Sequence, residues 1–341
     1  YPALDSPEFR DGLAHLARQL DALDADLHDH QVARGGPVPA AAGELAALAG
    51  GYLERMNALQ RHAQTLRNYV WAEVSTNSYH QQARRLLSEI DSLLVRAQRQ
   101  QVLYRGWLGT AAGEGDRFAA ALDLPGPARD HRFYVQEEAE QSRYLMSEAE
   151  ETLAAELSLS GARAWQNLQG VVASQIKVAF KRGGDRVEEL PITVLQNLRN
   201  DPNEEVRRQA FEAEVAAWER VREPLAACLN GVKGAVGTLD RRRGRQDSLH
   251  HSLDQERIDR QTLEAMLGAM RDSFPAFRRY FRHKAGLLGK AALPWWDLFA
   301  PLGSAQEHMA WDQARDFLLE QFASFSPELE AFGRRSFAER W

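Results

Sequence analysis

Apolar residues recur three and four positions apart along most of this chain, which is the period of an amphipathic α-helix. One stretch shows the pattern clearly: Val221, Leu225, Cys228, Leu229, Val232, Val236 and Leu239. Residues with this spacing share one helix face, and that face must be covered by other helices to leave water. The sequence therefore predicts a mainly α protein, built as a multi-helix shell.

Helix starts are marked by short side-chain oxygens placed before a proline or an acidic residue. Such an oxygen accepts a hydrogen bond from a free N–H group of the first turn, where proline needs no donor. The marked starts are Ser6 before Pro7, Asp201 before Pro202, Ser304 with Glu307, and Ser326 before Pro327. Together with the apolar period they support the assignment of helices.

The expected helices cover most of the 341 residues. They span residues 7–29, 40–75, 78–108, 114–122, 136–157, 162–173, 193–200, 202–240, 260–288, 305–325 and 327–339. The first three would form a long antiparallel hairpin-like bundle. One segment departs from the period, because two alternating runs flank Gly183, Gly184 and Asp185, and this predicts a small β-hairpin near 174–190.

Glycines interrupt the helical pattern between residues 109 and 115, and we place a subdivision there. The expected parts are a long-helix bundle over 1–115, a helical segment with the β-hairpin over 116–200, and a further helical part over 201–341. The chain starts at Tyr1 and stops at Trp341 without the usual signals of a natural end, which suggests a fragment.

The net charge of −6 offers no general attraction to nucleic acid or to anionic membranes, so neither partner is expected. No apolar stretch approaches the ~20 residues that span a bilayer. The only cysteine, Cys228, cannot form an internal disulfide, which favours a cytoplasmic location. Cys228 also lies on the apolar helix face, so we interpret it as a core residue.

No motif for catalysis occurs in the sequence. Two histidines one helical turn apart, with a glutamate beside the first, would bind zinc, but no histidine here is followed by glutamate. His251 with Asp254 and His308 with Asp312 come nearest, and surface hydrogen bonding explains both pairs better. Nucleophile elbows and phosphate-binding loops are missing from the sequence as well. The chain itself is therefore expected to hold no metal or cofactor.

Two sequence features invite two interpretations each. Gly231, Gly234 and Gly237 could allow close helix packing or a groove for a peptide. The basic run 241–245 could pair with carboxylates at a helix end or bind nucleic acid. The net negative charge of the chain favours the first interpretation. The glutamates between 137 and 151 are interpreted as a solvated face, and Pro224 predicts a kink.

Several segments in a fixed order resemble the oligoendopeptidase F family of thimet-oligopeptidase-like zinc metallopeptidases. They are residues 1–9, the run LMSEAEETLAAELSLSGARAW at 145–165, and residues 201–208, 229–234, 257–263 and 296–301. Together they cover nearly the whole chain. It is thus similar to the amino-terminal portion of that family, without the catalytic H-E-x-x-H part.

The resemblance implies a helical shell around a deep channel, in which zinc-activated water hydrolyses short unstructured peptides. The zinc ligands of the family would lie after the end of this chain, in a catalytic domain that would be its partner. This chain would form the wall and roof of the channel and be inactive alone. As a hypothesis, Asn230, Lys233, Trp296 and Asp297 lie near the channel, although core packing is the favoured interpretation of Trp296 and Asp297.

A second function stays open beside the peptidase. The chain could be a non-catalytic helical module that binds peptides or a partner protein on a peptidase scaffold. A reading frame that continues into H-E-x-x-H would favour the enzyme, whereas a stop codon after Trp341 would favour the module.

Overall fold

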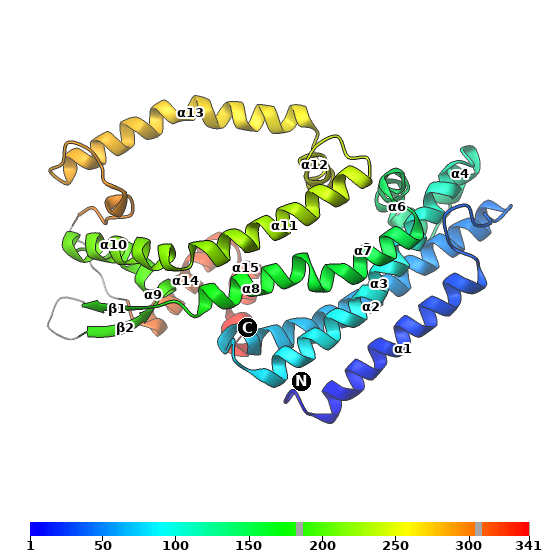
Figure 1. Ribbon diagram of the computed structural model, residues 1–341, viewed down its shortest axis with the longest axis horizontal. Coiled ribbons are helices and arrows are strands. Elements are labelled where there is room, and N and C mark those ends of the chain that lie inside the picture. Colours follow the sequence, from blue (N-terminus) through cyan, green and yellow to red (C-terminus); the bar gives the residue numbers. More distant parts are fainter. Residues whose placement is uncertain (182–186, 304–308, 341) are drawn as a thin grey trace.

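The computed structural model describes residues 1–181, 187–303 and 309–340, and it is mainly helical (Figure 1). The amino-terminal bundle consists of α1 (Pro7–Asp29), α2 (Ala42–Thr76) and α3 (Gln81–Ala112). The Ser6 hydroxyl accepts from the Phe9 N–H at 3.2 Å and so caps α1. The three helices pack on one another, which confirms the predicted hairpin-like bundle.

Shorter elements follow the bundle. They are α4 (Asp116–Asp123), α5 (Pro127–Asp130), α6 (Arg132–Gln141), the 3-10 turn η1 (Ser142–Tyr144), α7 (Glu148–Ser160), α8 (Ala162–Ser174), β1 (Lys177–Lys181), β2 (Val187–Pro191), α9 (Ile192–Asn197) and η2 (Leu198–Asn200). The strands pair antiparallel, with Lys177 opposite Pro191 and Lys181 opposite Val187. The predicted β-hairpin is confirmed, while its turn at Gly183, Gly184 and Asp185 lies outside the described residues.

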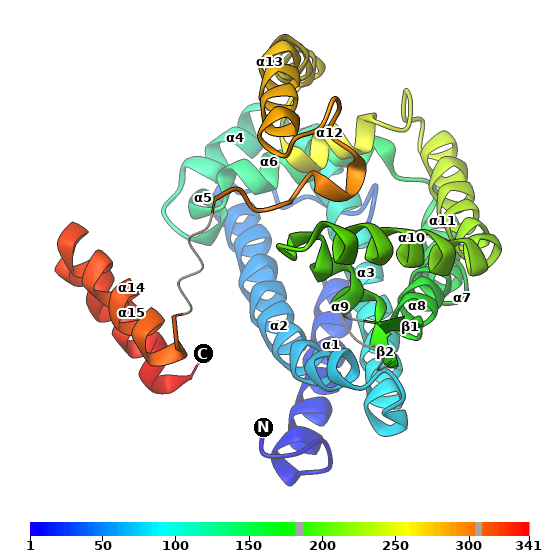
Figure 2. The same ribbon diagram turned by 90° about the vertical axis from the view of Figure 1, so that its left-hand side faces the viewer.

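The rest of the chain is again helical. It contains α10 (Glu204–Arg220), α11 (Arg222–Arg242), α12 (His250–Glu256), α13 (Arg260–Leu287), η3 (Trp295–Asp297), α14 (Trp311–Phe325) and α15 (Pro327–Glu339). In Figure 1 the bundle lies at one side, α7, α8 and α11 lie in the middle, and α13 runs along the opposite side. Figure 2 shows α14 and α15 together, apart from the other helices.

Most of the buried apolar side chains belong to the first part of the chain. The largest core cluster runs from Leu4 to Ala139 and so continues past the expected subdivision at 115, while the division into three parts stays a prediction. A smaller cluster joins the β-hairpin to α9 and α10, from Ile176 to Ala217. Cys228 is 2% exposed, which confirms its interpretation as a core residue. None of the described helices is long and apolar enough to cross a membrane.

Two expected helices are interrupted in the structure. The helix expected over 136–157 is divided by η1 and by a new start at Ser147, whose hydroxyl accepts from the Glu150 N–H at 3.3 Å. The helix expected over 202–240 ends at Arg220 and restarts at Arg222. Pro224 therefore sits in the first turn of α11, where its missing N–H breaks no helical hydrogen bond.

The caps of the later helices agree only partly with the expected ones. Asn203, and not Asp201, caps α10, because its side chain accepts from the Glu205 N–H at 2.9 Å. The cap expected at Ser304 with Glu307 lies outside the described residues, and α14 begins at Trp311. Ser326 caps α15 as predicted.

Close packing of α8 on α11 explains one of the three glycines of α11. A Cβ atom on Gly231 would lie 2.4 Å from Cδ1 and Nε1 of Trp165, so only hydrogen fits there. Gly234 and Gly237 meet open space instead, with no atom within 4 Å of the position that a Cβ atom would take. Helix packing is thus confirmed for Gly231 and does not extend to the other two glycines.

Replacement of Gly231 by alanine should destabilise the protein although alanine is the better helix former. Overpacking against Trp165 costs about 1–3 kcal/mol, whereas Gly234→Ala should stabilise the open position by up to about 1 kcal/mol. Urea unfolding of both variants measures the difference. Equal shifts in the same direction would contradict the packing of Gly231 on Trp165.

Candidate functional site

Helix α13 is the least covered long element of the described chain. None of the described elements packs extensively on it, and its first buried side chain is that of Lys284. Apolar side chains nevertheless follow one another along it at helical spacing: Met266, Met270, Phe274, Phe277 and Tyr280 are 47–56% exposed. A stripe of this kind marks a surface that binds another polypeptide or ligand.

Ion pairs hold the start of this uncovered segment on the amino-terminal half. Arg243, at the end of α11, donates from Nε and Nη2 to the two oxygens of Glu151 in α7, at 3.0 and 2.6 Å. Arg242 pairs with Glu150 at 2.9 Å, and Arg257 pairs with Glu137 through two 2.9 Å hydrogen bonds. The basic run therefore pairs with carboxylates at a helix end, as one of its two interpretations expected.

The glutamates between 137 and 151 are not a solvated face throughout, and this interpretation was wrong. Glu138 and Glu151 are 5% and 4% exposed. Glu138 accepts two hydrogen bonds from Arg105 at 2.8 and 2.9 Å. Burial of a carboxylate is stable only when a partner compensates the lost hydration, and the arginines provide that partner.

A polar cavity of about 190 Å³ lies beside these pairs. Arg245 lines it, with its guanidinium 3.8 Å from the centre of the Tyr144 ring and hydrogen bonds to Gln141 and Asp254. Asp240 is 7% exposed, and neither its Oδ2 atom nor Nε of Arg245 has a hydrogen-bond partner among the described residues. Such orphaned atoms indicate room for ordered water in the cavity.

His251 lines the same cavity. Burial and, after it, the positive charge of Arg245 lower the pKa of its imidazole. The residue paired with Asp254 is its neighbour His250, with Nε2 and Oδ2 3.8 Å apart. Asp254 also accepts from Gln141 and Arg245, so positive and amide groups already surround its carboxylate.

A second buried cluster holds the segment that follows α13. Asp297 of η3 is completely buried, and its Oδ1 atom accepts from Nη2 and Nε of Arg207 at 2.7 and 3.0 Å. Lys290 pairs with its other oxygen. Burial alone would raise the pKa of Asp297, but the hydrogen bonds from Lys290 and Arg207 outweigh it and lower the pKa. Lys284 donates to the Leu298 carbonyl at 2.9 Å.

The four residues predicted near a channel lie in two separate places. Asn230 and Lys233 are exposed on α11. Trp296 is half-buried and its ring lies 5.8 Å from that of Phe211, while Asp297 belongs to the buried cluster. The structure thus gives Trp296 and Asp297 packing contacts, and their place near a channel stays a prediction, as it does for Asn230 and Lys233.

No metal site can be built from the described residues. Nowhere in 1–181, 187–303 and 309–340 do three or more His, Cys, Asp or Glu side chains lie close enough together to hold an ion. His308 of the pair with Asp312 lies outside these ranges. The side chains within these ranges therefore do not fit a zinc ion.

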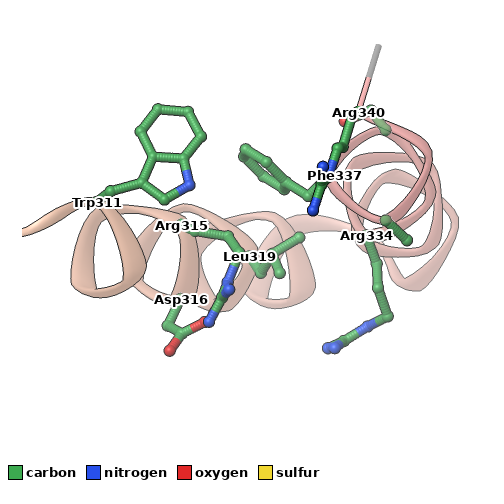
Figure 3. A pocket seen from close by; sticks show the side chains of 9 residues that line it. Trp311, Arg315, Asp316, Leu319, Arg334, Phe337 and Arg340 are labelled. Atoms are coloured by element: carbon green, nitrogen blue, oxygen red, sulfur yellow. The ribbon is translucent and has the colours of Figure 1, made fainter.

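Helices α14 and α15 enclose an open pocket of about 740 Å³ between them (Figure 3). Trp311 and Phe337 stand across from one another, with ring centres 6.1 Å apart and ring planes at 82°. Arg315 pairs with Asp312 at 2.9 Å, and Arg334 pairs with Glu330. Trp311 is 73% exposed, so this pocket is part of an uncovered apolar surface like that of α13.

Comparison with known sequences connects the chain to peptidases. The family model described as Oligopeptidase F matches residues 114–177. Group B oligopeptidase PepB of Streptococcus agalactiae is 22% identical over 230 residues, which cover 67% of this chain and 38% of PepB. Oligopeptidase PepF of Bacillus subtilis is 20% identical over 211 residues, which cover 61% of this chain and 31% of PepF. The chain thus matches well under half the length of these relatives.

Solved structures share the fold. Oligoendopeptidase-F from Enterococcus faecium is similar with a TM-score of 0.71 at 16% identity, over 98% of this chain and 67% of that chain. PZ peptidase A, solved with an inhibitor, is similar with a TM-score of 0.66 at 11% identity, over 98% of this chain and 54% of that one. At such identities the likeness shows the arrangement of helices and nothing more.

Asp297→Asn should destabilise the protein strongly, because it leaves the buried guanidinium of Arg207 without its counter-charge. Loss of one partner of a buried ion pair costs about 3–5 kcal/mol. The matched control is Asp312→Asn, whose side chain is 77% exposed and pairs with Arg315 at 2.9 Å; it should cost at most about 1 kcal/mol. Urea unfolding followed by tryptophan fluorescence measures both, and similar losses would contradict the anchoring role of Asp297.

The free energy of unfolding should decrease as the pH is lowered through the range where histidines of the unfolded chain take up protons. The pKa of His251 is lowered in the folded state by burial, so below about pH 6.5 the unfolded chain binds a proton that the folded chain does not. One such histidine contributes a slope of at most about 1.4 kcal/mol per pH unit. His251→Gln should flatten the dependence between about pH 7 and 5, which thermal unfolding at several pH values measures.

His28→Gln is the control for this experiment, because that side chain is 90% exposed. It should leave the slope unchanged. His62, whose pKa is also lowered by burial and by His15, remains in both variants, so a smaller slope should persist. An identical slope in wild-type protein and His251→Gln would rule out the contribution of His251.

Proposed function

Because this chain belongs to the oligoendopeptidase F family, we propose that it is the amino-terminal part of an enzyme that hydrolyses short, unstructured peptides. Its helices would form the wall and roof of the substrate channel. The observation that carries the proposal is the sequence similarity to two peptidases along about two thirds of the chain.

The uncovered apolar faces support this role. Helices α13, α14 and α15 expose large side chains such as Phe277, Trp311 and Phe325, the last at 84%. Apolar surface of this extent is stable in water when another polypeptide covers part of it. We propose that a catalytic domain of the same protein packs on these helices and that this chain is inactive alone.

The residues of this chain would act on the substrate through shape and contact. Asn230 and Lys233 are exposed on α11, where an amide and an ammonium group can pair with the backbone or a carboxylate of a peptide. Trp296 and Asp297 would fix the neighbouring loop through their packing contacts. A narrow entrance between such helices would exclude folded proteins, which explains a preference for short peptides.

Hydrolysis itself would depend on zinc bound elsewhere in the complete protein, where the ion supplies an activated water. The channel wall itself would be held together by the apolar core and the buried ion pairs of this chain. A cytoplasmic location stays part of the proposal.

The alternative is a non-catalytic module that binds peptides or a partner protein on the same scaffold. The open pocket of α14 and α15 and the uncovered stripe of α13 would suit such a module equally well. Activity of the full-length gene product distinguishes the two functions.

The deciding experiment uses the native, full-length product of the gene and a quenched fluorescent oligopeptide. We expect cleavage that a chelator abolishes and that added zinc restores. The same peptide sequence placed inside a folded domain is the matched control and should resist cleavage. If the full-length product contains no zinc and does not cleave the free oligopeptide, the proposed enzymatic function is wrong and the binding module is the remaining function.

A further inference from the structure

A groove of about 500 Å³ lies between the connected ends of α2 and α3 and the helices α7 and α8. We call it the hairpin groove. Its volume falls in the range of roughly 300–1,000 Å³ that encloses small organic ligands. None of the four residues predicted near the channel lines it, so it is a separate feature of the fold.

The floor of the hairpin groove is apolar. Trp71 and Val74 contribute to it from α2, Leu87 from α3, and Leu159 and Val171 from α7 and α8. Trp71 is 48% exposed, although an indole ring stabilises a fold most when it is buried. An exposed tryptophan at the edge of an apolar floor is a typical anchor for a bound side chain.

One face of α8 supplies polar groups to the groove. Arg163, Gln166, Asn167 and Gly170 follow one another at helical spacing and all line it. The side-chain amides of Gln166 and Asn167 bond to no other group of the described chain, so they are available as donors and acceptors. Gly170 leaves open space above the helix, because no atom lies within 4 Å of the position of a Cβ. Amides in this arrangement suit the backbone of a peptide.

The electrostatic balance of the groove is positive. Its one carboxylate, Asp91, is already paired with Arg67 at 3.2 Å. Arg84 and Arg163 line the groove, and neither guanidinium has an ion pair or hydrogen bond within the ranges the structure describes. Arg163 also stands in the first turn of α8, where the helix dipole adds positive potential. The groove therefore lacks an anion that these groups would bind.

We propose that the hairpin groove binds a short peptide through its free carboxylate, with apolar side chains of the peptide against Trp71 and the carboxylate against Arg84 and Arg163. Guanidinium groups recognise carboxylates through paired hydrogen bonds, and this fits a peptide end better than a neutral segment. The choice of a peptide rests on the proposed function, but binding here requires no hydrolysis.

The test is a binding measurement by fluorescence anisotropy, with an amino-terminally labelled Ala-Leu-Phe-Leu peptide and its carboxyl-terminal amide. A chelator is present throughout, so cleavage cannot consume the probe. Loss of a charge-assisted hydrogen bond should weaken binding of the amide about tenfold or more relative to the free acid. Equal affinity of the two peptides, or no binding of either, would overturn the proposal.

Variants assign the effect to the groove. Arg84→Met and Arg163→Met should each weaken binding of the free acid about tenfold and leave that of the amide nearly unchanged. Trp71→Ala should weaken both peptides. Arg18→Met, an exposed arginine of α1 remote from the groove lining, is the matched control and should match wild-type protein.

The two proposals fail in different ways. A full-length protein that does not cleave peptides but still prefers the free acid through Arg84 and Arg163 would support the groove and overturn the enzyme. Cleavage together with wild-type binding by both arginine variants would overturn the groove alone. Circular dichroism and unfolding midpoints of the variants confirm that each one is folded.

Discussion

The bidentate ion pair between Arg243 and Glu151 connects the second half of the chain to the first. The side chain of Glu151 is 3% exposed, and its carboxylate also accepts a hydrogen bond from the Met146 N–H at 3.1 Å, just before α7 begins. One buried carboxylate therefore sets the start of α7 and the end of α11 together. A buried charge without its partner is strongly unfavourable, so this contact fixes where the segment that leads into α12 and α13 leaves α11.

Helix α13 is held at its ends and not along its length. The arginine pairs with α6 and α7 stand at one end, and the Asp297 cluster with Arg207 and Lys290 stands at the other. Between them the helix offers its apolar stripe to solvent. Polar contacts thus fix where the stripe lies, while its apolar surface stays exposed, as the proposed packing of a catalytic domain on α13 requires.

Local patterns were enough to predict most of the helices, because capping and apolar spacing act within one or two turns. The bounds of α1 and α15 agree with the expected ones, and Ser6 and Ser326 cap them. Contacts between residues that are far apart in the sequence leave no such local signal. Arg207 and Asp297, which are joined by a hydrogen bond, are 90 positions apart. Glu138 and Glu151 were interpreted as solvated for the same reason, because their arginine partners lie far away in the sequence. The hairpin groove is formed by residues of four helices, so no single segment of the sequence predicts it.

The concentration of the main core before residue 140 bears on how the protein is made. Helices that neighbour one another in sequence supply nearly all of that core, so its contacts are local and form fast. At ribosomal speeds of ~5–20 residues per second, about 200 further residues take roughly 10–40 s to emerge. The nascent chain can thus present a finished bundle to its own later helices.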